Sequence, residues 1–199
     1  MGFYVTDQDP HGFVLHNSTN PWLHWVLRQI PATINEDIRD NLASNLKHII
    51  VGLELKASLL RAHLEREPGS NSRLFESYAQ IMNFEFCVGT YSILEGLGSV
   101  IWFDQNENDG TNPGKFGRND WRSSLAATYD SDNEGDLVNL VRTVESVRDK
   151  LHQDKLVSRI QIDWHAFDSD RSFIPAIRAL RIILARSPQG LPEHSPLFE

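Results

Sequence analysis

Apolar residues recur at helical intervals over most of the chain. The clearest stripe consists of Ile38, Leu42, Leu46, Ile49, Leu53, Leu60 and Leu64. Spacings of this kind are typical of one face of an α-helix. Thr33 and Glu36 have the spacing of a capping box at its start, and Pro68 and Gly69 form a turn at its end. The pattern predicts a long helix within residues 34–66.

A second long apolar segment follows that turn and predicts a helix over about residues 72–103. It is apolar on nearly all sides from Ile81 onward, which is typical of a helix at the centre of a bundle. Its polar residues argue against a membrane span; they are Asn83, Glu85, Thr90 and Glu95. Because glycine is a poor helix former, Gly89, Gly96 and Gly98 predict either close approach by a neighbouring helix or an early helix end. The two helices would form an antiparallel hairpin.

Shorter helical patterns make up the rest of the chain. Asn20 and Pro21 are typical of a helix start, and Pro31 would end that helix. Further helices are predicted over about residues 120–128, 136–154 and 172–186, the last with Ser172 as its cap. Segment 157–168 is ambiguous, because Ile160 and Ile162 alternate as in a short extended run.

The segments without periodicity complete the organisation. They are an irregular lead-in at 1–20, an acidic loop at 104–118 and a C-terminal tail at 187–199. No internal repeat is present. We therefore predict a single all-α domain, an antiparallel up-and-down bundle of about four to six helices built on the long hairpin.

Charge and cysteine content narrow the classes of protein. The 199 residues carry a formal net charge of −8, which disfavours unselective nucleic-acid binding by the whole surface, and no pattern of a DNA sequence reader is present. The only cysteine, Cys87, excludes an intramolecular disulfide and fits a reducing compartment; we expect it to behave as a small apolar core residue. With no predicted signal peptide or membrane span, we expect a cytoplasmic protein.

The most informative segment lies near the end of the helix predicted at 136–154. At about 100° per residue, Arg148 falls roughly 20° from Leu137, inside the apolar stripe of this helix. Glu145 and His152 lie about one turn before and after it, on the same edge of the buried face. A guanidinium inside an apolar stripe requires a carboxylate partner, a groove or a subunit interface.

Two interpretations of this cluster stay open. In the structural one, Glu145 and an acid from the central helix pair with Arg148, while His152 caps carbonyls at the helix end. In the functional one, Arg148 binds a phosphate and His152 acts as general acid or base, because its pKa lies nearest neutrality among side chains.

The run Arg148-Asp149-Lys150-Leu151-His152, in a late helix of a predicted bundle, resembles the motif of the HEPN superfamily: an arginine, a polar residue and then a histidine. The resemblance implies an up-and-down helical bundle, commonly a homodimer that brings two Arg–His pairs together. Many such proteins are metal-independent endoribonucleases. Arg148 would take the family's arginine, Asp149 the polar position and His152 the histidine. The spacing between Arg148 and His152 is shorter than is usual in the family.

The resemblance thus leads to one hypothesis and leaves a second. In the first, His152 assists attack of a ribose 2′-hydroxyl on the adjacent phosphate and Arg148 stabilises the phosphoryl oxygens, unless the site is an inactive remnant. In the second, the protein is a non-catalytic helical module that binds a protein partner, and Arg148 and His152 are structural.

Other charged residues have simpler interpretations. Lys56 and Glu85 fall on the apolar stripes of the two hairpin helices and predict a buried structural ion pair. Arg171, Arg178 and Arg186 share one side of the last helix, a basic stripe that is either a solvated face or a contact for RNA or an acidic partner. They lie opposite Phe173, Ile177, Leu180 and Leu184.

No recognised cofactor or metal pattern occurs. Asp163, His165 and Asp168 match no zinc or calcium spacing, and we expect a loop in which Trp164 and Phe167 pack. The chain lacks Glu-x-x-His, His-Glu-x-x-His and Gly-rich phosphate-loop motifs. We therefore predict neither a metal nor a cofactor.

Overall fold

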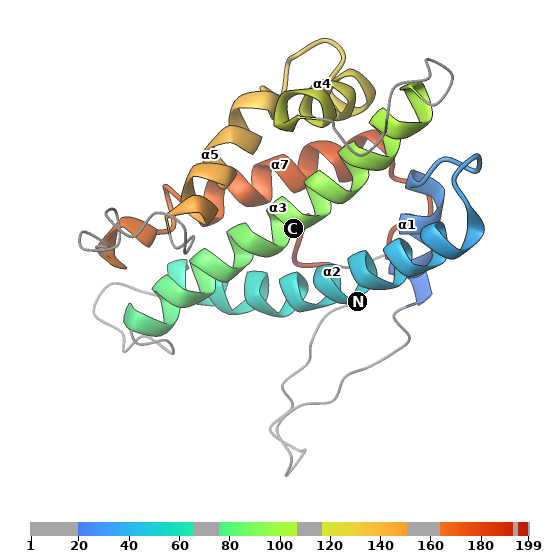
Figure 1. Cartoon of the computed structure of the whole chain (residues 1–199). Helices are drawn as coiled ribbons and strands as arrows, with labels where there is room; N and C mark the ends of the chain where they lie inside the picture. Colours follow the sequence, from blue (N-terminus) through green and yellow to red (C-terminus); the bar gives the residue numbers. More distant parts are fainter. Residues whose placement is uncertain (1–19, 66–75, 107–116, 151–163, 193–194, 199) are drawn as a thin grey trace.

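The computed structural model describes residues 20–65, 76–106, 117–150, 164–192 and 195–198. Within these ranges the chain is helical and contains no strand (Figure 1). The elements are α1 (Asn20–Gln29), α2 (Glu36–Leu64), α3 (Glu76–Asn106), α4 (Arg118–Tyr129), α5 (Leu137–Asp149), the 3-10 helix η3 (Trp164–Phe167) and α7 (Phe173–Arg186). The predicted all-α helical bundle is confirmed. Residues 1–19 of the predicted lead-in and the Ile160–Ile162 run lie outside the described residues.

α2 and α3 form the predicted antiparallel hairpin. Contacts between them pair Leu46 with Gly96, Leu53 with Gly89 and Lys56 with Glu85. Because residue numbers rise along one helix as they fall along the other, the two helices run in opposite directions. α1 packs against α2, at the edge of the bundle away from α5 (Figure 1).

α3 is the central helix, as its apolar pattern predicts. It contacts α2, α4, α5, α7 and η3. Phe86, Cys87 and Leu94 on α3 are fully buried. Among the described helices, α3 alone is long and apolar enough to cross a membrane, and 56% of its most apolar window is buried inside the bundle.

The glycines of α3 permit the close packing expected from the sequence. A Cβ built on Gly98 would lie 2.8 Å from the backbone oxygen of Trp121, so α4 approaches the backbone of α3 directly. Cβ atoms on Gly89 and Gly96 would lie 2.9 Å and 3.2 Å from leucine side chains of α2. Close approach, and not an early helix end, explains these three residues.

The start of α2 differs from the predicted capping box. The Asn35 side chain caps the helix by accepting hydrogen bonds from the backbone N–H groups of Asp37 (3.0 Å) and Ile38 (3.4 Å). The Thr33 hydroxyl instead donates a hydrogen bond to Asp104 at the far end of α3. The capping box was wrong because Asn35, nearer to the apolar stripe, is an equally suitable N-cap and Thr33 makes a tertiary contact.

The acidic loop is shorter than predicted. α3 continues to Asn106, whose side chain donates to the Trp102 carbonyl (2.7 Å), and α4 begins at Arg118. Residues 104–106 contain neither glycine nor proline, and polar composition alone does not end a helix. Asp120, predicted at the start of α4, lies within its first turn and accepts a hydrogen bond from the Gly117 N–H (2.7 Å).

The last helix and the tail complete the core. α7 begins after Ser172, as predicted, although the Ser172 hydroxyl makes no capping bond. The predicted tail is not wholly peripheral, because Ser195 and Leu197 are buried and the Leu197 carbonyl accepts a hydrogen bond from Arg181 (3.0 Å). Cys87 is buried, donates to the Ser172 carbonyl (3.2 Å), and has a pKa raised to about 12 by burial.

Candidate functional site

Arg148 lies near the end of α5, where the amphipathic pattern placed it. Val141 and Val144 of the same helix are buried, and the Arg148 side chain is 24% exposed. Its guanidinium lies 4.5 Å from the ring centroid of Tyr91 on α3, a cation–π contact. Arg148 therefore joins α5 to α3 at the edge of the core.

Glu145 has different partners from those predicted. It is buried and binds Arg122, itself buried, and Arg118 (2.6 Å), both on α4. No ion pair joins Glu145 to Arg148 among the described residues. The predicted Glu145–Arg148 pair is therefore wrong, because two α4 guanidinium groups occupy the carboxylate.

Asp149 connects the two parts of this cluster. One of its carboxylate oxygens lies 3.1 Å from Arg148, and the other lies 3.1 Å from Arg118. The Arg118 side chain is 57% exposed, so this arm of the network is open to solvent. The carboxylate thus holds one guanidinium from α5 and one from α4.

The ring beneath Arg148 belongs to a tyrosine that remains neutral. Burial raises the pKa of Tyr91 to about 12, and the negative charges of Glu95 and Glu145 add to this effect. Its hydroxyl donates a hydrogen bond to Glu95 (3.3 Å). A neutral aromatic face against a guanidinium is a stable packing arrangement.

The chemistry available to this cluster follows from its charges. Arg118, Arg122 and Arg148 pair with the carboxylates of Glu145 and Asp149, so most of the charge in the group is balanced. Such a network joins helices strongly when its buried members are satisfied. The exposed part of the guanidinium groups of Arg118 and Arg148 can also contact an anion. His152, the predicted acid or base, lies outside the described residues, so its pairing with Arg148 stays a prediction.

The three arginines of the predicted basic stripe are exposed, but Arg171 lies in the turn before α7 and two of the three are paired. Arg171 lies 3.5 Å from Asp168, and Arg186 lies 2.6 Å from Asp132. Arg178 is exposed between them. The opposite face is buried through Phe173, Ile177, Leu180 and Leu184. These pairs favour the solvated-face interpretation.

The segment before α7 packs largely as expected. Phe167 is buried against Phe84 of α3, with ring centroids 5.3 Å apart, whereas Trp164 is 40% exposed. The Asp168 side chain accepts a hydrogen bond from the backbone N–H of Arg171 (2.8 Å) and so helps to start α7. No group of three metal-binding side chains occurs in the described part of the chain.

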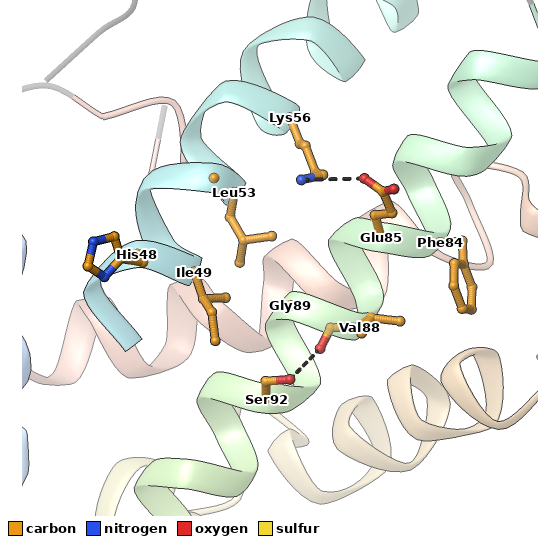
Figure 2. Close-up of a pocket in the computed structure, with 10 residues that line it drawn as sticks. His48, Ile49, Leu53, Lys56, Phe84, Glu85, Val88, Gly89 and Ser92 are labelled. Atoms are coloured by element: carbon orange, nitrogen blue, oxygen red, sulfur yellow. Dashed lines mark hydrogen bonds and ion pairs between the residues drawn. The ribbon is translucent and has the colours of Figure 1, made fainter. Parts of the chain in front are cut away.

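The Lys56–Glu85 pair forms but is not buried. The two charged groups lie 3.5 Å apart, and their side chains are 26% and 53% exposed (Figure 2). The buried charge of α2 is instead Glu54, which the apolar pattern did not single out. The burial of Glu54 was not predicted, because its sequence neighbours are leucines and no charged residue lies three or four positions away along the helix.

Sequence reasoning also missed Arg118 and Arg122. A signal existed, because these arginines are four residues apart and Glu145 and Asp149 are also four residues apart. Two antiparallel helices with such pairs can align both charges on one face. Arg118 was not predicted to lie on a helix, because the glycines, proline and polar residues before it are typical of a loop.

Comparison of the chain with known protein families, with curated proteins and with solved structures found no match.

Proposed function

We propose that the protein is a non-catalytic helical module that binds a protein partner and that Arg148 is structural. The observation that carries the proposal is the contact network of Arg148 and its neighbours. Arg148 stacks on Tyr91, while Glu145 binds Arg118 and Arg122. Each of these contacts joins two helices, so a structural role accounts for the partial burial of Arg148 and for the burial of Glu145.

The proposal has a direct test in the stability of Arg148 variants. Arg148→Ala loses the cation–π contact and is expected to lower the free energy of unfolding by about 1–2 kcal/mol. Arg148→Lys, which keeps the charge but not the planar group, is expected to recover only part of that loss. Arg142→Ala is the matched control, because Arg142 lies on the same helix and is exposed. Urea unfolding measures all three.

A structural Arg148 also implies a negative result with RNA. Labelled mixed RNA is incubated in EDTA with the wild-type protein and with the Arg148→Ala and Arg142→Ala variants. We expect no difference between the wild-type and Arg148→Ala proteins in RNA cleavage. An Arg148→Ala variant that is as stable as wild type and loses a cleavage activity would refute the structural role.

A second candidate function is a metal-independent endoribonuclease. It is favoured by the partial exposure of Arg148 and by the exposed Arg118, which shares Asp149 with it. Two guanidinium groups held near one another can contact phosphate oxygens. Cleavage in EDTA that leaves 2′,3′-cyclic phosphate ends and is lost in both His152→Ala and Arg148→Ala would establish this candidate.

The cysteine content bears on the cellular compartment of the protein. A buried, single cysteine fits a reducing compartment, and we assign the protein to the cytoplasm. The homodimer that the resemblance implies, with two Arg–His pairs brought together, belongs to the second candidate, the endoribonuclease.

A further inference from the structure

A groove runs along the surface between α2 and α3, on the side of the hairpin away from Arg148. Its volume is about 490 Å³. Ile49, Leu53, Val88 and Gly89 form its apolar floor, and the Lys56–Glu85 ion pair stands at one end (Figure 2). Arg148 stacks on Tyr91. At about 100° per residue, Tyr91 lies roughly 200° around the axis of α3 from Gly89. The groove and the arginine cluster therefore lie on opposite sides of the central helix.

Gly52, in the wall of this groove, has no explanation within the described chain. The glycines of α3 accommodate close neighbours, but a Cβ built on Gly52 meets nothing within 4 Å. Gly52 has no positive φ, so its backbone does not require glycine either. A glycine in the middle of a 29-residue helix weakens that helix. The missing side chain is explained if another backbone approaches α2 at this point.

Apolar side chains extend the groove in both directions. Ile38 on α2 is 58% exposed, and on α3 Tyr78 and Ile81 are 60% and 42% exposed. Helical spacing puts Ile38 within roughly 40° of Gly52, and puts Tyr78 and Ile81 within roughly 40° of Glu85. These exposed side chains add apolar surface at both ends of the groove.

The charges of this face favour a second copy of the chain as the occupant. Two molecules of net charge −8 repel each other overall, so contact is least costly where the local charge is zero. The groove satisfies this condition, because Lys56 and Glu85 balance each other and the only other titratable residue lining it is His48. A twofold interface requires one self-complementary patch, and a patch with one charge of each sign meets that requirement.

We infer that two copies of the chain associate through the α2–α3 face, with the α2 helices crossing at Gly52 and each Lys56–Glu85 pair facing its equivalent. This inference rests on the proposed partner-binding function and identifies the partner. In this dimer the two Arg148 clusters lie on outer sides, unlike the dimer implied by the resemblance, which brings the Arg–His pairs together.

Sedimentation analysis of the full chain over a range of concentrations tests the interface. We expect a wild-type dimer, and we expect Gly52→Leu to raise its dissociation constant by about tenfold or more, because the added side chain blocks close approach. The monomer should stay folded, since the new side chain points into open space. Ala185→Leu, which adds a leucine at an exposed position of α7, is the control and should leave the dimer unchanged.

Charge reversal gives an independent test. Lys56→Glu alone places like charges at the interface and should weaken the dimer, and Lys56→Glu combined with Glu85→Lys should restore it. A wild-type protein that is monomeric throughout, or a dimer indifferent to Gly52→Leu, would overturn the inference. Either result leaves the structural role of Arg148 intact, since unfolding and RNA cleavage by the Arg148 variants decide that separately.

Discussion

The α4–α5 contact and the α2–α3 groove both contain oppositely charged side chains between antiparallel helices, but they differ in burial. In the first, Glu145 is buried and bonded to Arg118 and Arg122. In the second, Lys56 and Glu85 are 3.5 Å apart on an open face. A carboxylate enclosed by two guanidinium groups fixes how helices pack, whereas an exposed pair contributes little and leaves the surface free for another molecule.

The largest expected effect comes from removing the buried carboxylate. Glu145→Ala leaves the Arg122 guanidinium, 8% exposed, without its charged partner, and should lower the free energy of unfolding by about 3–5 kcal/mol. Glu85→Ala, the equivalent change in the groove, should cost less than about 1 kcal/mol. Urea unfolding of both variants, under conditions in which the protein is monomeric, measures the difference. Equal losses would mean that the two regions do not differ as described.

Adding one methyl group tests the packing difference. Gly98→Ala places its Cβ 2.8 Å from the Trp121 oxygen and should destabilise the protein by about 1–3 kcal/mol. Gly52→Ala meets nothing and should stabilise the monomer by about 1 kcal/mol, because alanine is the better helix former. Thermal unfolding at concentrations that give monomer reports both values. A loss of stability at Gly52 in the monomer would show that the wall of the groove is not open.

The smallest effect concerns a buried and an exposed carboxyl group of the hairpin, Glu54 on α2 and Glu85 on α3. Burial raises the pKa of Glu54, and the nearby polar groups of Ser195 and Trp22 offset only part of this effect. The carboxyl group of Glu54 then binds its proton more tightly in the folded state than in the unfolded chain. The stability that this proton contributes is present in acid and is lost as pH rises through the folded-state pKa. Glu54→Gln should be at least as stable as wild type at neutral pH, with the difference shrinking in acid. Urea unfolding at several pH values measures it.

Glu85→Gln serves as the control for Glu54→Gln, since Glu85 lies on the open face. It makes the same change from carboxyl to amide at an exposed position and so reports any effect of the substitution itself. If Glu54→Gln unfolds with the same pH dependence as wild type, Glu54 does not titrate differently in the two states.

The bundle was largely predictable, and its charge pairing was not. Periodicity located α2, α3 and α7 because burial of an apolar stripe acts along one helix, where the spacing can be read directly. It also placed Arg148 at the edge of the core. The partner of Glu145 depends on which helix lies beside α5, a property of the tertiary arrangement that spacing within α5 does not contain. Lys56 and Glu85 were paired correctly because the hairpin fixes their neighbours, but their exposure depends on what covers the hairpin.

Cys87 provides a built-in reporter on the centre of the molecule. It is the chain's single cysteine, it is completely buried on α3, and its sulfur donates a hydrogen bond to Ser172, the residue that precedes α7. A thiol in this environment reacts only when the protein opens, because both access and ionisation are suppressed in the closed state. The rate at which a thiol reagent modifies the native protein therefore records how often α7 separates from α3, without any label having to be introduced.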